Sequence, residues 1–227
     1  MMQKHRSSET AVSVLRPTTP PDIGRRNQRQ RIVDAMIDSC AEKTYAATTI
    51  TDIVARARIS RTTFYKQFED KRACFEAAVD HCIEQLQEAA AAAHSPEDEP
   101  GDATRKAAAA FLQVLAARPG LAQMLTGDAI AVDPMAIERY RKATIPPLEA
   151  LWARDGRSGK AHTDPRLAFG QVQVLILNQI ATGKADRLPE LLPEIAYLAV
   201  SPFGGHEEAL NQSQLARESA MGGAVLR

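Results

Sequence analysis

The chain has 227 residues, 44% of them hydrophobic and 25% charged, and its formal net charge is zero. These values are ordinary for a soluble globular protein, and the length suffices for the buried core of one large or two small domains. The longest apolar stretch, 172–180, is too short to span a bilayer, and residues 1–21 lack the apolar core of a secretory signal. We therefore predict a cytoplasmic protein with no membrane partner.

The zero net charge hides an uneven distribution along the sequence. Residues 24–74 hold eleven Lys or Arg against six Asp or Glu, whereas residues 75–227 hold fourteen against twenty. A basic N-terminal third beside an acidic remainder fits a protein in which one part faces a polyanion.

The N-terminal third is predicted to be a tail followed by short helices. Residues 1–24 mix Ser, Thr and Pro without periodicity and are expected to be disordered. A helical pattern over 28–43 follows. Thr49 and Asp52 then have the spacing of a capping box, which predicts the start of a second, short helix.

A third helix is predicted over 61–67, because Ser60 is a favourable N-cap. Asp70 is expected to cap a long fourth helix over 71–93. Two short helices joined by a three-residue turn are typical of a helix-turn-helix, in which the second helix enters the major groove of DNA. Residues 25–72 are therefore predicted to form a helix-turn-helix DNA-binding domain.

The third helix has two distinct sides. Phe64 and Phe68, at i and i+4, are expected to anchor it to the domain. Arg61 can pair bidentately with a guanine edge, and Thr62 or Thr63 can touch a thymine methyl group. Phosphate contacts are expected from the other polar positions. The predicted DNA-binding residues are Arg25, Arg26, Thr49, Arg58, Ser60, Arg61, Thr62, Thr63, Tyr65, Lys66 and Lys71.

Residues 29–86 resemble the DNA-binding domain of the tetracycline-repressor (TetR) family. The resemblance rests on the continuous stretch 41–55 and on a set of later positions, Ile59, Ser60, Thr63, Phe64, Tyr65, Phe68, Lys71 and Phe75. It implies an all-α homodimer with a variable helical C-terminal domain, and usually a repressor that a ligand releases from double-stranded DNA.

Two positions depart from the family pattern. Arg58 stands in the helix-helix turn where the family usually has glycine, and Thr44 stands where a glycine often ends the first helix. If the backbone at Arg58 is left-handed, a non-glycine residue costs about 1 kcal/mol. The arginines of 25–31 are either an arm that follows the phosphates or the basic start of a soluble helix.

Beyond a polar, double-proline break at 94–101, the sequence predicts only further helices, at 103–117, 120–125, 134–153, 165–182 and 189–200. The chain is therefore predicted to be all-α, with a helical ligand-binding and dimerisation domain over 73–200. Residues 201–227, with glycine pairs and scattered polar residues, are expected to be a C-terminal tail.

The helix predicted over 165–182 is apolar around much of its circumference, as is the one over 189–200. Such helices are either internal or shared with a partner. We expect them to form an isologous homodimer contact, with an ordinary monomer core as the alternative.

An unidentified small-molecule effector is expected to bind between the middle helices. The residues predicted to contact it are Phe111, Leu115, Met124, Tyr140, Trp152 and Asn178. Each apolar one of these could equally be plain core. Asn178 is either a polar group inside a cavity or an interface residue.

Two other functions compete with an operator-binding repressor. An all-α enzyme with a DNA-binding head would need a catalytic constellation, but no nucleophile elbow, phosphate-binding glycine loop or metal-ligand spacing is present. We predict no metal and no cofactor. A redox-sensing regulator would use Cys74 and Cys82, which are too far apart on one helix to bridge within a chain, so it would need an intermolecular or adduct mechanism. In a reducing compartment we expect the three cysteines to be buried thiols.

Overall fold

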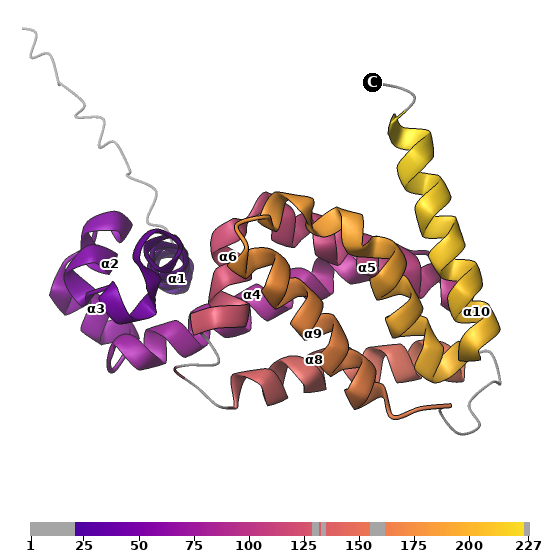
Figure 1. Ribbon diagram of the computed structural model, residues 1–227. Coiled ribbons are helices and arrows are strands. Elements are labelled where there is room, and N and C mark those ends of the chain that lie inside the picture. Colours follow the sequence, from indigo (N-terminus) through magenta and orange to yellow (C-terminus); the bar gives the residue numbers. More distant parts are fainter. Residues whose placement is uncertain (1–20, 129–131, 133–134, 155–161, 225–227) are drawn as a thin grey trace, which may run out of the picture.

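The computed structural model describes residues 21–224 except 129–131, 133–134 and 155–161. Every regular element within these residues is helical, as the sequence predicts (Figure 1). The prediction for residues 1–20 concerns residues outside the described part. Among the helices described, none combines the length and the apolar character needed to cross a membrane.

The N-terminal part consists of α1 (Pro21–Ala47), α2 (Ile50–Ala57), α3 (Arg61–Gln67) and the start of the long α4 (Lys71–Ala92). Helix α1 begins before the expected end of the tail, because a proline is favourable at the first position of a helix. It is bent at Thr44, whose φ of 71° and ψ of 159° are not helical. The backbone at this position is thus one that glycine adopts more easily.

The C-terminal part follows α4 in the order α5 (Pro100–Ala117), α6 (Pro119–Gln123), the π-helix η1 (Met124–Asp128), α8 (Ala136–Ala153), α9 (Pro165–Ala181), the 3-10 helix η2 (Ala185–Leu191) and α10 (Leu192–Ala224). Helix α4 joins the two parts, since its N-terminal end lies beside α1 and α3 and its body runs among the C-terminal helices (Figure 1).

One hydrophobic cluster extends through both parts of the chain. Helix α4 contributes a continuous buried face to it, which includes Phe75, Val79 and Leu86. Helix α6 lies against α1 so closely that a Cβ at Gly120 would be 2.2 Å from the Cβ of Ala41. The predicted boundary at residue 72 therefore falls at the start of a helix that both parts share, and not in a linker.

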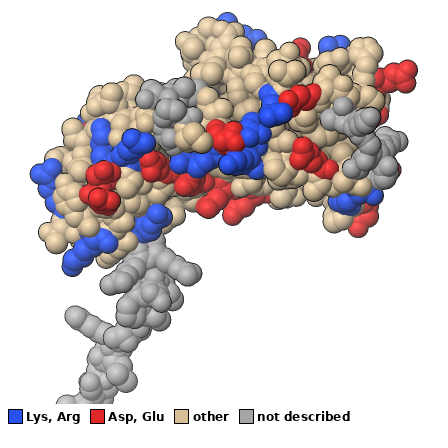
Figure 2. All heavy atoms as spheres, turned by 90° about the horizontal axis from the view of Figure 1, so that it is seen from below, with Lys and Arg blue, Asp and Glu red and all other residues tan. Residues whose placement is uncertain are grey.

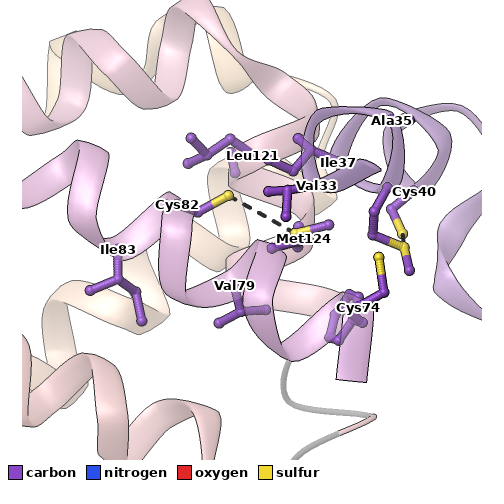
Figure 3. Close-up of a cluster of buried hydrophobic side chains, with 14 of the residues drawn as sticks. Val33, Ala35, Ile37, Cys40, Cys74, Val79, Cys82, Ile83, Leu121 and Met124 are labelled. Atoms are coloured by element: carbon purple, nitrogen blue, oxygen red, sulfur yellow. Dashed lines mark hydrogen bonds between the residues drawn. The ribbon is translucent and has the colours of Figure 1, made fainter. Parts of the chain in front are cut away.

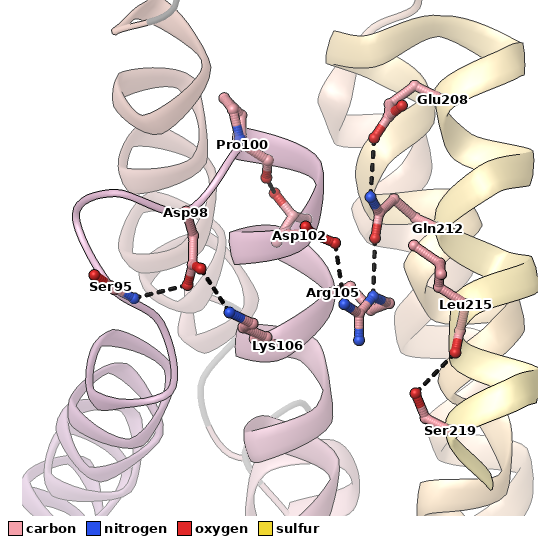
Figure 4. Close-up of polar contacts among 11 residues, drawn as sticks. Ser95, Asp98, Pro100, Asp102, Arg105, Lys106, Glu208, Gln212, Leu215 and Ser219 are labelled. Carbon is pink, nitrogen blue, oxygen red and sulfur yellow. Dashed lines mark hydrogen bonds and ion pairs between the residues drawn. The ribbon is translucent and has the colours of Figure 1, made fainter. Parts of the chain in front are cut away.

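The prediction of a C-terminal tail over 201–227 is wrong for the residues described, because α10 continues to Ala224 after a change of direction at Gly205 (φ 78°). This second half packs on α5 (Figure 4). Arg105 donates a hydrogen bond from Nε to Oε1 of Gln212 at 2.9 Å, and its Nη2 lies 3.0 Å from Asp102. The buried face is made of small or polar residues, namely Ala209, Gln212, Ser213 and Ala216. Because this face is weakly hydrophobic, the sequence shows no apolar helical periodicity here from which the helix could be predicted.

Candidate nucleic-acid interface and neighbouring cavity

The first helix of the helix-turn-helix is capped as the sequence predicts. The hydroxyl of Thr49 accepts a hydrogen bond from the amide of Asp52 at 3.2 Å, and the Asp52 carboxylate accepts one from the amide of Thr49 at 2.9 Å. Asp52 also pairs with Lys43 of α1 at 2.7 Å. These hydrogen bonds hold the pKa of Asp52 well below its usual range. The carboxylate thus occupies the positive end of α2.

The turn between α2 and α3 is left-handed at Arg58, with φ 53° and ψ 51°. A non-glycine residue in this conformation costs about 1 kcal/mol. The guanidinium of Arg31 donates hydrogen bonds to the carbonyl oxygens of Ala57 and Arg58, which are left without helical partners at this helix end. Arg31 therefore stabilises a left-handed turn at Arg58, a conformation that glycine would adopt more easily.

Helix α3 is fixed to the domain by its aromatic residues. Phe64 is fully buried and Phe68 nearly so, with ring centroids 5.8 Å apart. The Ser60 hydroxyl accepts a hydrogen bond from the amide of Thr63 at 3.0 Å and so caps the helix. The side opposite the two Phe rings is exposed and carries Arg61, Thr62, Tyr65 and Lys66. Tyr65, the largest of these, is 53% exposed.

The positive charges of this region divide into paired and unpaired groups. Arg56 pairs with Glu42 at 2.5 Å, as Lys43 does with Asp52. Within the described residues, Arg58, Arg61 and Lys66 have no ion pair. Figure 2 shows blue and red side chains interleaved over one face of the molecule. Among the side chains that the structure describes here, the cations without an ion pair, hydrogen bond or ring contact therefore lie on α3 and the turn before it.

Lys71, predicted to contact a phosphate, makes contacts within the protein. Its ammonium group donates hydrogen bonds to the carbonyl oxygens of Tyr45 and Thr48, at 3.0 and 2.9 Å. It also lies 4.1 Å from the centroid of the Tyr45 ring. Lys71 thereby closes the C-terminal end of α1 onto the start of α4.

The four arginines of 25–31, predicted to lead into the first helix, all lie within α1. The guanidinium of Arg29 lies 4.9 Å from the centroid of the Phe68 ring, and Arg31 holds the turn. For these two residues the structure gives intramolecular contacts. Arg25 and Arg26 belong to the first turns of α1, and their side chains are outside the described residues.

A cavity of about 520 Å³ lies between α4, α5, α8, α9 and α10. Of the six residues predicted to contact an effector, Phe111 and Tyr140 line it, with their rings stacked at 6.3 Å. Burial raises the pKa of Tyr140, so its hydroxyl stays protonated at neutral pH.

The other four residues predicted to contact an effector do not line this cavity. Leu115 and Met124 are buried in the main core, and Trp152 stacks on Phe203 in a second, smaller cluster. Asn178 is exposed on α9 and does not line the cavity. The periodicity of apolar residues in the sequence identifies the buried face of a helix, but it does not distinguish a packed core from the wall of a cavity.

The three cysteines are buried, as expected (Figure 3). Burial raises the pKa of Cys40 to about 11 and the pKa of Cys74 and Cys82 to about 12. The reactive thiolate is therefore scarce at neutral pH. Among the residues that the structure describes, no group of His, Cys, Asp and Glu is placed to hold a metal ion.

This capped pair of helices, in which α3 is anchored by buried aromatic rings and exposes cationic side chains, has the arrangement of a helix-turn-helix unit of the kind that binds DNA. Residues 32–78 match the model of a family described as bacterial regulatory proteins of the tetR family. Over these residues the N-terminal part of the chain is similar to this family.

Solved structures show that the likeness extends over the fold of the described chain. The fatty acid degradation regulator FadR from Bacillus halodurans has a TM-score of 0.67 at 18% identity, over 78% of this chain and 95% of that one. FadR from Bacillus subtilis, in complex with stearoyl-CoA, has a TM-score of 0.65 at 18% identity, over 78% and 98%. A TetR family transcription regulator from Marinobacter aquaeolei VT8 has a TM-score of 0.60 at 18% identity, over 86% and 96%. A comparison with curated proteins finds none whose sequence matches this chain.

Proposed function

We propose that the protein is a transcriptional repressor that binds a palindromic DNA operator as a homodimer and is released by a small-molecule effector. The observation that carries the proposal is the exposed side of α3, where Arg61, Tyr65 and Lys66 project from a helix anchored by Phe64. A short helix of this kind presents hydrogen-bond donors to the acceptor-rich major groove.

The DNA contacts divide by chemistry. Arg61 reads a base edge, assisted by Thr62 or Thr63, while Tyr65 and Lys66 bind phosphates. Arg58, exposed and without an ion pair among the described residues, adds a phosphate contact from the turn. The hydroxyls of Thr49 and Ser60 are engaged in helix caps, so these residues contribute to DNA binding by positioning the helices.

Dimerisation through the helices over 165–182 and 189–200 is supported most directly by α9. One face of α9 is exposed, and beyond Arg166 in the first turn its members are uncharged, namely Leu167, Gly170, Gln171, Val174, Asn178 and Ala181. Leu167 and Val174 are 67% and 65% exposed. An exposed apolar stripe marks a surface for association. Residues 189–200 turn Ile195, Ala196 and Val200 inward, so they support α9 from within the subunit.

Release by an effector is supported by the cavity between the C-terminal helices. Its volume lies within the ~300–1,000 Å³ typical of small-molecule sites, and Phe111 and Tyr140 line it. The Bacillus subtilis neighbour, which shares the fold, is described in complex with stearoyl-CoA. A ligand in the cavity would act on DNA binding through α4, which lines the cavity with Leu86 and begins beside α3.

The test is the selection of bound fragments from a genomic DNA pool by the full-length protein. We expect a palindrome with half-sites about one helical turn of DNA apart. Recovery of a non-palindromic sequence would contradict recognition of the operator by a homodimer. Retention of random fragments only would contradict sequence-specific binding.

A further inference from the structure

The body of the cavity is apolar. Its walls include Leu86, Phe111, Ile145, Phe169, Val172 and Ile195. Tyr140 stands between Phe111 and Phe169, with ring centroids 6.3 and 5.3 Å away. This continuous aromatic wall between α5, α8 and α9 favours an occupant whose main part is apolar.

Several polar groups in the walls are engaged within the protein. Gln87 donates to the carbonyl oxygen of Ala143 at 2.8 Å, and Thr144 donates to that of Tyr140 at 2.9 Å. The Thr104 hydroxyl donates to the carbonyl oxygen of Pro100 at 2.7 Å. These groups therefore offer little to a ligand beyond shape.

One end of the cavity is different, because His94 and Arg154 line it there. The Nδ1 atom of His94 is buried and has no hydrogen-bond partner among the described residues. A buried polar atom without a partner costs free energy that a bound group can recover. Arg154 donates to the carbonyl oxygen of Pro96, close along the chain to His94. Its guanidinium forms no ion pair with any described residue.

Two acidic groups lie near this end, and each has hydrogen-bond partners of its own besides its electrostatic interaction with His94 (Asp98) or Arg154 (Glu97). Asp98 pairs with Lys106 at 2.6 Å and accepts a hydrogen bond from the amide of Ser95 at 2.8 Å (Figure 4). Glu97 accepts one from the Ser95 hydroxyl. Among the described residues that line the cavity, none is Asp or Glu. The polar end of the cavity is thus complementary to a negative charge.

We propose that the cavity binds an apolar molecule with a single anionic group at one end. The apolar body lies along the Phe111, Tyr140 and Phe169 wall, and the anionic group binds at His94 and Arg154. A carboxylate and a phosphate share this chemistry. The inference rests on the proposed function in that it names the class of the effector, while the binding itself is measurable on the protein without DNA.

The test is calorimetric titration of the full-length protein with probes of one chain length, kept below their critical micelle concentrations. Decanoate and decyl phosphate carry the anionic group, decan-1-ol is neutral, and decyltrimethylammonium is cationic. We expect either anion to bind at least about fivefold more tightly than the alcohol, since a hydrogen bond to a charged group exceeds a neutral one. The two anions distinguish a carboxylate from a phosphate ligand.

Variants assign the binding to the cavity. Arg154→Gln should reduce anion affinity to that of decan-1-ol and leave the alcohol unchanged. Lys142→Gln, on the same helix but 69% exposed and paired with Glu138, is the matched control and should change neither. Ala143→Phe and Val172→Trp, which fill the cavity from α8 and α9, should abolish binding of all probes. Circular dichroism identifies the variants that remain folded.

Equal affinity for decanoate and decan-1-ol would overturn the proposal. Unchanged anion affinity in Arg154→Gln, or no binding of any probe, would overturn it as well. Operator release is measured separately on the protein–DNA complex. If an anion binds with the expected Arg154 dependence but leaves the operator bound, the ligand class stands and the effector part of the proposed function fails.

Discussion

The carboxylate of Asp128, at the end of η1, accepts a hydrogen bond from the backbone amide of Tyr45 at 3.0 Å. Tyr45 follows the non-helical Thr44 in α1, and its carbonyl oxygen accepts from Lys71. The segment that precedes the helix-turn-helix is therefore held from two directions, by a C-terminal element and by α4. This contact fixes where α2 begins relative to the cavity-bearing helices.

Removal of the carboxylate should loosen this connection. In Asp128→Ala the Tyr45 amide loses its partner, which lowers the free energy of unfolding by about 1 kcal/mol. Operator affinity should fall with it, because the orientation of α2 and α3 becomes less defined. Urea unfolding and fluorescence anisotropy with labelled operator measure the two effects. Asp128→Asn keeps an acceptor oxygen and should retain most of both, so equal losses in the two variants would argue against the hydrogen bond.

Two substitutions of Arg58 separate the effect of backbone strain in the left-handed turn from the effect of the arginine's charge. Arg58→Gly should raise the free energy of unfolding by about 1 kcal/mol relative to Arg58→Ala, because glycine adopts this conformation without a Cβ penalty. Both variants remove the same charge, so they should lose DNA affinity equally. Chemical denaturation of the three proteins checks the first expectation, and a shared change in salt dependence checks the second. Equal stability of the Gly and Ala variants would show that the turn relaxes when Arg58 is absent.

Substitutions on α3 should separate base reading from phosphate binding. Lys66→Ala should weaken binding to all sequences and reduce the log–log salt slope by about 0.9, and Tyr65→Ala should also weaken binding broadly. Arg61→Ala should in addition relax the preference at one base position by about 1–3 kcal/mol. Competition binding with single-base variants of the selected operator measures this. Unchanged binding in all three variants would mean that another helix reads the DNA.

The capping carboxylate of α2 predicts a pH dependence. Contacts with Lys43 and Thr49 lower the pKa of Asp52 in the folded chain. The ionised group therefore stabilises the fold above about pH 4. This contribution declines as the pH falls further, because the unfolded chain takes up the proton first.

The stability difference between the wild type and Asp52→Asn should thus be largest near neutral pH and shrink towards pH 3. Thermal unfolding across this range measures it. Lys43→Gln, which removes the largest cause of the lowered pKa, should show part of the same loss. A difference that stays constant with pH would contradict the assignment.

The sequence predicts those features of the helix-turn-helix that depend on residues close together in the chain. The Thr49–Asp52 capping box, the Ser60 cap and the burial of Phe64 and Phe68 follow from spacings of three or four positions. The bonds of Lys71 could not be predicted this way, because their acceptors are backbone carbonyl oxygens more than twenty residues earlier in the chain. For the same reason the sequence leaves Arg31 between a DNA-binding arm and the basic start of a soluble helix, and does not indicate its bonds to the turn.

The cavity was harder to predict than the DNA-binding face. Phe111 and Tyr140 were expected on its walls, but His94 and Arg154 were not, although both line its polar end. Each lies in sequence next to a predicted helix end, where a polar residue carries no distinctive signal. The two residues indicate a polar site only when they are considered together. The sequence does not show that they lie together, because this depends on the C-terminal ends of α4 and α8 being close in space.

The hydrogen bonds from Arg31 to the turn at Arg58 imply that the effect of a substitution at one of these positions depends on the residue at the other. With glycine at 58 the turn no longer needs external support, so a substitution of Arg31 that is harmful in the wild type should be tolerated in the Arg58→Gly background. Such epistasis would allow one residue to change only after the other. The order of substitutions open to this chain is thereby constrained by a single side chain that reaches from α1 to the end of α2.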